Sequence, residues 1–545
     1  MSRTLFLYVF KDLLKYFIIA AVALSAIMSF GGLLKPLTKQ GLDIAQVGWM
    51  LTYLMPAMMT YSLPIAALFA TTIIYGRLSA DNELTACRAS GISYLSMTAP
   101  AMLLGLTVAI GSLLFLCFVV PMFTLQVERV LYSNIAQLVA NRIERDHAIP
   151  FNDVTIYADA ATLPQAPPEA PDVQIVRLLN PTIVTLERID PKDPELQRPR
   201  DFFTARQATA FIREQEDGDA TLEVILEGGS KFPRNLAGGS QIGIGRTTFG
   251  PITIDSAIRE NSKFMDISQL KAVLSDPLKS REISRLVDQA LTRHRMRLYA
   301  REIYESLAGP ARQFTFVSGD EHTTIQAGST PPAYSNDGVV LTFREPPERR
   351  PVGFIERADG NILSATAAVI RIGLSPAQNG TAADVVLELV DATLQTGSGP
   401  ANHTRFIRTL RTSLPPAIAT SRALPQDSDE YSHIRRRAHR LYNDVLSEIH
   451  ARVSFAISCL ILVMVGCALG IMFRSANFLS AFAVSVVPAV LCVALIVTGQ
   501  HTAKNIPTDL SAAGQALKLG LMLIWSGNIA TLLIAVVLLW KLQRQ

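Results

Sequence analysis

The chain has 545 residues, of which 49% are hydrophobic and 18% are charged, and its formal net charge is +4. An ordinary soluble enzyme needs a smaller apolar fraction for its core, so the composition argues against that class and favours a membrane protein. The net charge says little about partners, because a long translocated domain lies outside the charge rule that orients membrane proteins.

Six apolar runs are each long enough to cross a bilayer, which takes about 20 residues at about 1.5 Å of rise per residue. They cover residues 16–34, 49–74, 97–123, 453–473, 478–497 and 517–540. Between the third and fourth runs, residues 128–450 mix charged residues, Pro, Gly and alternating apolar residues, as a soluble domain does. The predicted fold class is therefore an α-helical membrane protein with six transmembrane helices (3+3) and a large inserted domain.

The stretch before the first run, LFLYVFKDLLKYF, is typical of an amphipathic helix on the membrane surface, with Lys11 and Lys15 on its polar side. The alternative is a signal peptide that is cleaved near Ala20, within AAVALSA. We favour the amphipathic helix, because the apolar run continues past Ala20 and five more runs follow.

Basic residues in the short segments predict the orientation. One side of the membrane carries Arg3, Lys11, Lys15, Arg77, Arg88, Arg474, Lys541 and Arg544, and the other carries Lys35, Lys39 and Lys504. The positive-inside rule therefore places both termini in the cytoplasm. The large domain is then external, which in a Gram-negative cell means periplasmic, and the protein is expected in the bacterial inner membrane.

A polar segment, YGRLSADNELTACRASGIS at residues 75–93, separates the second and third runs and predicts a short helix over 79–90. The helix has a good N-cap, two acidic residues at the positive end of its dipole, a basic residue in its last turn and a glycine after it. These residues are Ser79, Asp81, Glu83, Arg88 and Gly91.

This helix has two interpretations. It is either a simple connector between two spans or a rigid docking surface for a soluble partner. Leu84 and Cys87 form a narrow apolar stripe on it, and the other positions are polar or small. Since a minimal connector needs only a few residues, the capped helix favours docking.

The inserted region alternates between β-patterned and helical blocks. Residues 153–258 and 314–414 read as short strands with Pro- and Gly-rich turns, whereas 266–307 and 430–450 have apolar positions every three or four residues. The chain is accordingly divided into an N-terminal membrane half, a first all-β, jellyroll-like domain, a helical connector, a second β-rich segment and a helical C-terminal membrane half. Their bounds are 1–127, 128–265, 266–310, 311–425 and 426–545.

The two β-patterned blocks resemble each other. TARQATAFIREQEDGDATLEVILEGG from Thr204 is similar to SATAAVIRIGLSPAQNGTAADVVLELVDA from Ser364, and RHRMRLYAREIYESLA from Arg293 is similar to RRAHRLYNDVLSEIHA from Arg436. The similarity indicates either a duplicated β-plus-helix unit or a chance likeness between short amphipathic segments.

The sequence offers no pattern of catalysis or of metal binding. The eight histidines are scattered, and the five cysteines lie in or beside the apolar runs. The stretch GGSQIGIGRTT lacks the spacing of a phosphate-binding loop, and neither G-x-S-x-G nor H-E-x-x-H occurs. We therefore expect no catalytic residues, no metal site and no cofactor.

One known family matches these motifs. LPIAALFATTIIYGRLSADNELTACRASGIS resembles the signature of the lipopolysaccharide export permeases LptF and LptG (YjgP/YjgQ), in which G-R-L-S-x-D-x-E-L-x-A-x-R-A-x-G follows the second span. SEIHARVSF is similar to the family's E-x-H-x-R motif at the start of the fourth span, and GCALGIMFRS to its end. The resemblance covers both membrane halves and is weak in the external region, where family members typically have one jellyroll and this chain has room for about two.

The resemblance implies the permease subunit of an ABC transporter. Such a subunit extracts lipopolysaccharide, or a related glycolipid, from the inner membrane and passes it through its periplasmic β domain to a bridge that crosses the envelope. The implied partners are an LptB-like cytoplasmic ATPase, a second LptF/LptG-type chain (a paralogue or a copy), and LptC/LptA-like bridge proteins; no nucleic acid is expected. The alternatives are the membrane subunit of another ATP-driven lipid or lipoprotein extractor, and an envelope scaffold without transport activity.

The family's coupling helix, which contacts the ATPase, maps onto five positions of this chain. They are Arg77, Asp81, Glu83, Leu84 and Arg88. We expect Glu83 to contact the ATPase, Leu84 to pack into the ATPase groove and Arg77 to lie at the membrane boundary.

Two further basic residues, Lys35 and Lys39, lie at the external end of the first span, against the positive-inside tendency. A phosphorylated lipid headgroup needs cations at that place, so these lysines are candidates to hold it. The alternative is that they are ordinary interfacial lysines.

Overall fold

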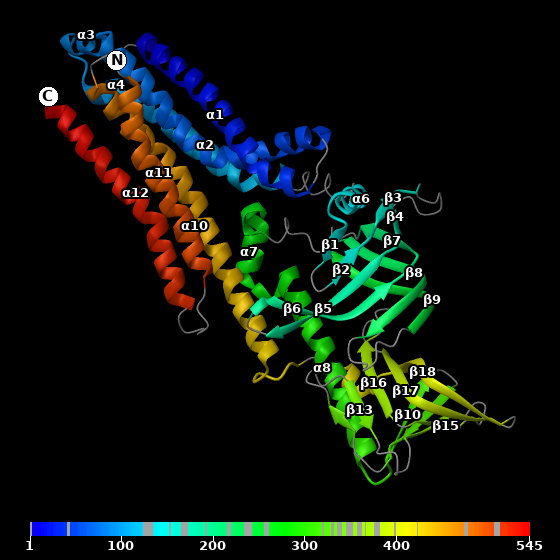
Figure 1. Ribbon diagram of the computed structural model, residues 1–545. Coiled ribbons are helices and arrows are strands. Elements are labelled where there is room, and N and C mark those ends of the chain that lie inside the picture. Colours follow the sequence, from blue (N-terminus) through cyan, green and yellow to red (C-terminus); the bar gives the residue numbers. More distant parts are fainter. Residues whose placement is uncertain are drawn as a thin grey trace. The chain divides into compact units, whose positions relative to one another are not determined.

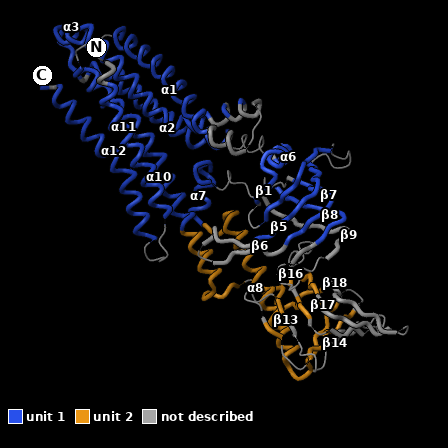
Figure 2. The backbone as a smooth tube through the Cα atoms, viewed as in Figure 1, with its two compact units in different colours: residues 1–276, 440–545 blue, residues 277–439 orange. Residues whose placement is uncertain are grey.

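The computed structural model describes residues 3–544 apart from several segments. The segments that are not described are 41–43, 124–134, 152–153, 165–172, 191–192, 215–219, 234–241, 255–260, 319–320, 329–331, 335–339, 345–351, 357–361, 366, 375–381, 397–398, 422, 474–477 and 506–512. The chain forms two compact units (Figure 2). Unit 1 contains Met1–Asp276 and Arg440–Gln545, and unit 2 contains Pro277–His439. One boundary falls within the predicted helical connector and the other within the predicted C-terminal half.

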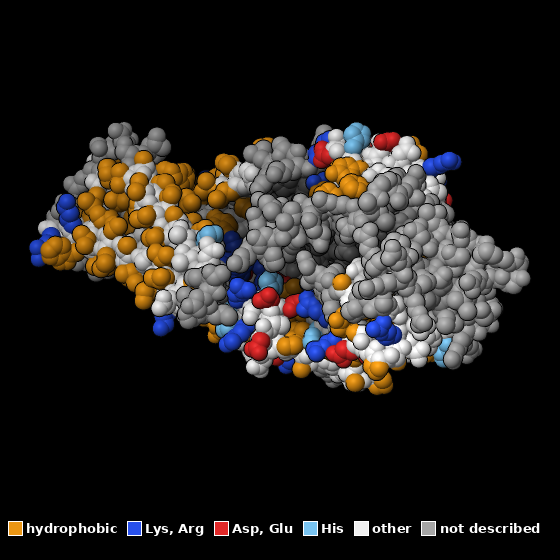
Figure 3. All heavy atoms as spheres, turned by 60° about the horizontal axis from the view of Figure 1, so that its bottom comes forward, with side chains coloured by type: hydrophobic (Ala, Val, Ile, Leu, Met, Phe, Trp, Pro, Cys, Tyr) orange, Lys and Arg blue, Asp and Glu red, His pale blue; other side chains and the backbone are white. Residues whose placement is uncertain are grey.

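Six helices of the described chain are long and apolar enough to cross a membrane, which confirms the six predicted apolar helices. They are α1 (Arg3–Gln40), α2 (Ile44–Ala80), α4 (Tyr94–Leu114), α10 (Asp429–Met472), α11 (Phe478–Lys504) and α12 (Ala513–Arg544). A π-helical turn, η1 (Phe115–Val119), follows α4, and the short α3 (Glu83–Ala89) lies between α2 and α4. We call the six long helices the bundle (Figure 1), and hydrophobic side chains gather over its surface (Figure 3).

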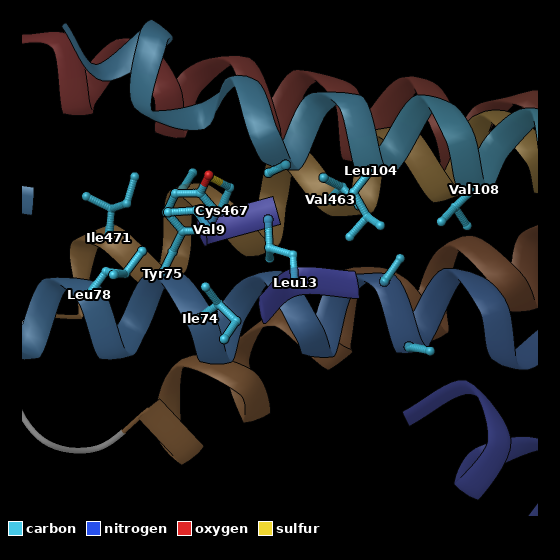
Figure 4. Packing of buried hydrophobic residues seen from close by; sticks show 14 of the residues in the cluster. Val9, Leu13, Ile74, Tyr75, Leu78, Leu104, Val108, Val463, Cys467 and Ile471 are labelled. Atoms are coloured by element: carbon cyan, nitrogen blue, oxygen red, sulfur yellow. The ribbon is translucent and has the colours of Figure 1, made fainter. Parts of the chain in front are cut away.

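Small residues bring α2 and α10 into close contact. A Cβ atom on Gly466 would lie 2.8 Å from the Leu68 carbonyl oxygen, and one on Gly470 would lie 2.9 Å from the Thr72 carbonyl oxygen. The two glycines are four positions apart, so both lie on one face of α10, which is the spacing that lets membrane helices approach closely. Side chains of α1, α2, α4 and α10 pack beside this contact, including Leu13, Ile74, Tyr75, Leu104, Val463 and Cys467 (Figure 4).

Unit 1 also holds a nine-stranded antiparallel sheet. Its strands are β1 (Ala148–Phe151), β2 (Val154–Tyr157), β3 (Ala160–Thr162), β4 (Val173–Leu179), β5 (Thr182–Asp190), β6 (Asp193–Thr204), β7 (Gln207–Glu214), β8 (Ala220–Pro233) and β9 (Ile242–Ile254). The strand order is β1-β2-β5-β6-β8-β7-β4-β3, and β9 pairs with the other side of β8. Alternate residues of β8, Leu222, Val224 and Leu226, are buried, as expected where one face of a sheet forms the core. The helix α6 (Ile135–Asp146) adds Ala136, Ala140 and Ile143 to this core.

Unit 2 holds a second nine-stranded antiparallel sheet. Its strands are β10 (Gln313–Ser318), β11 (Glu321–Gln326), β12 (Ala333–Tyr334), β13 (Val340–Arg344), β14 (Val352–Glu356), β15 (Ile362–Ala365), β16 (Ala367–Leu374), β17 (Ala382–Thr396) and β18 (Gly399–Ser413). The order is β10-β11-β14-β15-β17-β16-β13-β12, with β18 on the other side of β17. This order is that of the first sheet, which supports duplication over chance likeness.

Helices and turns connect these parts. The 3₁₀ turn η2 (Ser262–Phe264) and the helix α7 (Ile267–Ser275) follow the first sheet, and the turn η3 (Pro277–Lys279) leads to α8 (Arg281–Ala308). A helix of one turn, α9 (Pro416–Ala419), lies between β18 and α10. Asp266 begins α7 with a capping box, because its carboxylate accepts from the Gln269 N–H at 2.7 Å while the Gln269 side chain bonds the Asp266 backbone.

The close contact between α2 and α10 generates the first prediction. Gly466→Ala should lower the free energy of unfolding by about 1–3 kcal/mol, because the added methyl group has no space against α2. The thermal unfolding midpoint in detergent measures the loss. Gly111→Ala is the matched control on α4, since a Cβ atom there meets nothing within 4 Å. Equal midpoints for the two variants would contradict the tight packing.

Candidate functional site

The end of the bundle that carries α3 also carries the two described termini of the chain (Figure 1). Val9 near the N-terminus, Leu542 near the C-terminus and Leu84 of α3 belong to one buried cluster. The segment 75–93 is therefore packed on the bundle and does not project from it as a free loop.

The helix in this segment is shorter than predicted, and Ser79 does not cap it. α2 continues to Ala80, because Ser79 is buried and its hydroxyl donates to the Ile471 carbonyl of α10 at 3.0 Å. Asn82 precedes α3 with a left-handed backbone, φ 59°, and its side chain caps no N–H group. The sequence could not show that α10, almost 400 residues away, offers Ser79 a better partner than its own helix start.

Leu84 is 7% exposed and packs in the protein's own cluster, where it attaches α3 to the bundle. Its predicted packing into an ATPase groove stays a prediction. Asp81, Glu83 and Arg88 are exposed. The surface that α3 offers to a partner is therefore polar, with Glu83 at its start.

Three side-chain contacts lie in and beside α3, one from α3 itself and two from the end of α2. Arg77 donates to the Asp12 carboxylate of α1 at 2.6 Å, and the buried Tyr75 hydroxyl donates to the Met97 carbonyl of α4 at 2.8 Å. Arg88 donates to the Tyr94 hydroxyl at 2.7 Å, with its guanidinium 4.4 Å from the centre of the tyrosine ring. Arg88 thus fixes α3 to the start of α4, while Arg77 and Tyr75 fix the end of α2 to α1 and α4.

Lys35 and Lys39 lie in the last turns of α1, and their side chains fall outside the described part of the chain. Their predicted contact with a lipid headgroup stays a prediction.

A second cluster, which we call the buried ion-pair site, lies on α10 in the E-x-H-x-R motif. Glu448 and Arg452 are 7% and 2% exposed, and the Arg452 Nε atom lies 3.0 Å from the Glu448 Oε1 atom. The amide of Gln500 on α11 donates to the other carboxylate oxygen of Glu448 at 2.7 Å. The carboxylate therefore joins two helices of the bundle.

The same arginine holds the segment that follows the first sheet. Arg452 Nη2 donates to the carbonyl oxygens of Ser262, Lys263 and Met265 at 3.2, 3.1 and 2.9 Å. A planar guanidinium with several donors can serve an ion pair and a turn at once, which a lysine ammonium cannot do with this geometry. The sequence signal for this site was an ionisable pair, four residues apart, beside an apolar run.

Further polar contacts surround the ion-pair site. Lys504 lies 2.7 Å from the Asp444 carboxylate, and the Lys263 amine lies 3.4 Å from the Tyr61 hydroxyl of α2. Burial favours the neutral amine of Lys263, but Tyr61 and the carboxylates of Glu448 and Asp444 raise its pKa above the usual range, so Lys263 stays charged. The turn at 262–265 therefore meets α2 as well as α10.

No group of three or more His, Cys, Asp or Glu residues that could hold a metal ion occurs in the part of the chain that the structure describes. The contacts of both clusters suit mechanical connection. In the segment 75–93 they fix the short helix α3 to the bundle. In the buried ion-pair site they join a turn to two membrane helices.

Comparison with known proteins gives one family. The family described as lipopolysaccharide export system permease LptF/LptG matches residues 7–317 and 377–541. The match includes the segment 75–93 and the E-x-H-x-R motif, and it omits residues 318–376. No curated protein matches the chain.

The buried ion-pair site generates the second prediction. Arg452→Met should lower the free energy of unfolding by about 3–5 kcal/mol, because it leaves the Glu448 carboxylate buried without its counter-charge. The change is measured by thermal or denaturant unfolding in detergent.

Two further variants control this measurement. Arg440→Met alters an exposed arginine of the same helix and should change stability by less than about 0.5 kcal/mol. Glu448→Gln should reduce the cost of Arg452→Met, since the remaining amide carries no charge. Additive effects of the two substitutions would show that the pair is not coupled.

Proposed function

The chain belongs to the LptF/LptG family of lipopolysaccharide export system permeases, and from this membership we propose that it is the membrane subunit of an ABC transporter that extracts lipopolysaccharide or a related glycolipid. It is a multi-pass membrane protein and a transporter subunit. The observation that carries the finer proposal is the fixed position of α3, which exposes Glu83 at the end of the bundle.

α3 is the docking site of a separate cytoplasmic ATPase of the LptB type. Arg88 of α3 bonds Tyr94, and Arg77 and Tyr75 at the end of α2 bond Asp12 and Met97, so a push on α3 moves α2 and α4 as well. The exposed Glu83 carboxylate offers a charge-assisted hydrogen bond to the partner. Leu84 supports docking indirectly, because it holds α3 against the bundle.

The orientation follows from the same end of the molecule. Both termini lie beside α3 (Figure 1). Arg88 lies in α3, and Arg77 pairs with Asp12, the residue that follows Lys11. We place this end in the cytoplasm of a bacterial inner membrane and the two sheets in the periplasm. ATP hydrolysis and lipid passage then occur on opposite sides of the membrane.

The lipid passes from the bundle to the sheets and onward to an LptC/LptA-like bridge. Each buried CH₂ group contributes about 0.8 kcal/mol, so acyl chains need an apolar path through the periplasm. The aliphatic inner face of the first sheet, with Val224 and Leu226, supports this route. A second LptF/LptG-type chain, a paralogue or a copy, completes the membrane part of the transporter.

The family match over both membrane halves favours lipopolysaccharide export over the release of lipoproteins and over a scaffold without transport. Neither alternative is favoured by a specific contact within the described residues.

The docking proposal predicts that Glu83→Ala lowers the amount of ATPase that co-purifies with the tagged chain in mild detergent by at least about tenfold. Mass spectrometry of the purified material measures the ATPase and the bound phosphorylated glycolipid. Glu223→Ala removes an exposed carboxylate from β8 and should leave ATPase recovery unchanged. If Glu83→Ala recovers the full amount of ATPase, α3 is a simple connector between two spans.

The headgroup proposal predicts that Lys35→Glu combined with Lys39→Glu lowers the amount of co-purified lipopolysaccharide by at least about tenfold, because the phosphates then meet negative charge. Lys541→Glu is the control, since it changes an exposed lysine in the last turn of α12. The lipid is quantified by its phosphate content per protein. Unchanged lipid in the double variant would show that these lysines are ordinary interfacial residues.

A further inference from the structure

Two helices of unit 2, α8 and the start of α10, are joined by ion pairs. Glu282 of α8 pairs with Arg437 of α10, and Arg297 of α8 donates to the Glu430 carboxylate of α10 at 2.5 Å. The two pairs place residues 281–297 of α8 beside the first three turns of α10. The charged side chains of these two segments are therefore brought close together.

The two segments are rich in arginine. Residues 281–297 and 429–439 contain eight arginines, four carboxylates and no lysine. We call the arginines of unit 2 in these segments the arginine cluster. They are Arg281, Arg285, Arg293, Arg295, Arg297, Arg435, Arg436 and Arg437. Because cations outnumber carboxylates by two to one, the cluster attracts anions.

In both ion pairs the arginine is the more exposed partner. The side chains of Arg437 and Arg297 are 43% and 41% exposed, whereas those of Glu282 and Glu430 are 16% and 22% exposed. Arg293 is exposed as well. The charge that the two helices present to the solvent is therefore positive, with the carboxylates set behind the guanidinium groups.

One carboxylate also serves two arginines. Arg293 and Arg297 are four positions apart, so they lie on one face of α8. Arg297 donates to Glu430, and Arg293 acts electrostatically on the same carboxylate. A single negative charge cannot balance two guanidinium groups, so positive charge remains for an anion from outside.

Both helices are held by buried residues, which fixes the positions of the arginines. On α8, Tyr299 and Ile303 are buried in the core of unit 2. On α10, Ile434 and Ala438 are buried, and the three arginines at 435–437 lie between them in the sequence. A binding surface on rigid helices loses less conformational freedom when its ligand arrives.

The residue type indicates which anion fits. A guanidinium group is planar and carries five N–H donors, so it can bind a phosphate through two parallel hydrogen bonds, whereas a lysine ammonium is a point charge. All eight cations of the cluster that carry a permanent charge are arginines. The cluster therefore suits phosphate groups.

The length of α10 separates two sources of phosphate. Arg437 is sixteen positions before Val453, where the fourth apolar run begins, which is about 24 Å along one continuous helix. The headgroup layer of a phospholipid bilayer is only about 5–8 Å thick on each side of the hydrocarbon. Phosphates on a large saccharide headgroup extend further from the apolar run than those of a phospholipid.

We propose that the arginine cluster of unit 2 binds phosphate groups on the core sugars of the exported glycolipid. This inference rests on the proposed function, which brings such a lipid to the periplasmic part of the chain. Arg293 and Arg435, both exposed, donate to the phosphate oxygens. The ion-paired Arg297 and Arg437 supply further positive charge beside them.

Binding of labelled lipids to the full chain in mild detergent tests the proposal. Arg293→Gln combined with Arg435→Gln should raise the dissociation constant for lipopolysaccharide with a phosphorylated core at least about tenfold, and that for lipid A, which lacks the core, less than about twofold. Fluorescence anisotropy measures both constants. The difference should shrink as the salt concentration rises, because the contacts are exposed to solvent.

Two matched double variants control this measurement. Arg293→Lys with Arg435→Lys keeps the charge but loses the planar set of donors, so it should raise the dissociation constant by less than the glutamine variant does. Arg177→Gln with Arg213→Gln removes two exposed arginines of β4 and β7 and should leave binding unchanged. The thermal unfolding midpoint and the amount of co-purified ATPase show that each variant is folded, since α3 belongs to unit 1.

The outcomes separate this inference from the proposed function. If the glutamine variant binds lipopolysaccharide as the unmodified chain does, the inference is overturned and lipid extraction stands. If the unmodified chain binds neither lipid, both are overturned. An equal loss for lipid A, or for phosphatidylglycerol, overturns the assignment to core sugars. A lysine variant that binds as tightly as the unmodified chain overturns the paired arginine–phosphate hydrogen bonds.

A second measurement needs no substitution. Phenylglyoxal reacts with accessible guanidinium groups, and mass spectrometry locates the modified residues. Lipopolysaccharide with a phosphorylated core should slow the modification of Arg293 and Arg435 several-fold and leave Arg177 and Arg213 unaffected. Equal protection of all four arginines, or of none, overturns the proposal.

Discussion

The guanidinium of Arg452 is almost fully removed from solvent, and its partners come from several parts of unit 1. A buried cation needs a counter-charge and partners for its donors, because an unpaired charge in an apolar interior costs several kcal/mol. Glu448 supplies the charge, and three carbonyl groups of the turn at 262–265 supply the acceptors. The bonds of Nε and Nη2 thereby link α10, α11 and the segment after the first sheet, whereas Nη1 has no partner among the described residues.

This constraint reaches the other end of the membrane through one helix. α10 has 44 residues and is about 66 Å long at about 1.5 Å per residue. It carries Arg452 near its middle, and Gly466 and Gly470, which contact α2, in its last two turns. α2 leads directly to α3, so displacement of α3 by an ATPase would move α2 against α10. That movement would change the force on the Glu448–Arg452 ion pair. The chain thus contains a continuous packed connection from the proposed ATPase site to the turn beside the first sheet.

Much of the membrane part could be predicted from hydropathy, since each span is a long apolar run and no tertiary information is needed to recognise it. The exposed Glu83 and Arg88 also follow from local charge. Ser79 and Leu84 could not be assigned, because their partners lie on α10 and elsewhere in the bundle, far away in the sequence. The acceptors of Arg452 are almost 190 residues away for the same reason. Sequence likeness alone did not decide between duplication and chance likeness. The identical strand order of the two sheets supports duplication.

The most direct test of this account is ATP-driven lipid release from proteoliposomes that contain the complete transporter with Arg452→Lys. Lysine keeps the charge beside Glu448 but cannot reach three carbonyl groups with a planar set of donors. The account predicts that the ATPase assembles and hydrolyses ATP at its normal rate, while release of fluorescent lipopolysaccharide to a soluble acceptor falls at least about tenfold, or about 1.4 kcal/mol. Normal release with normal hydrolysis would contradict the claim that the buried ion pair connects the two ends of the protein.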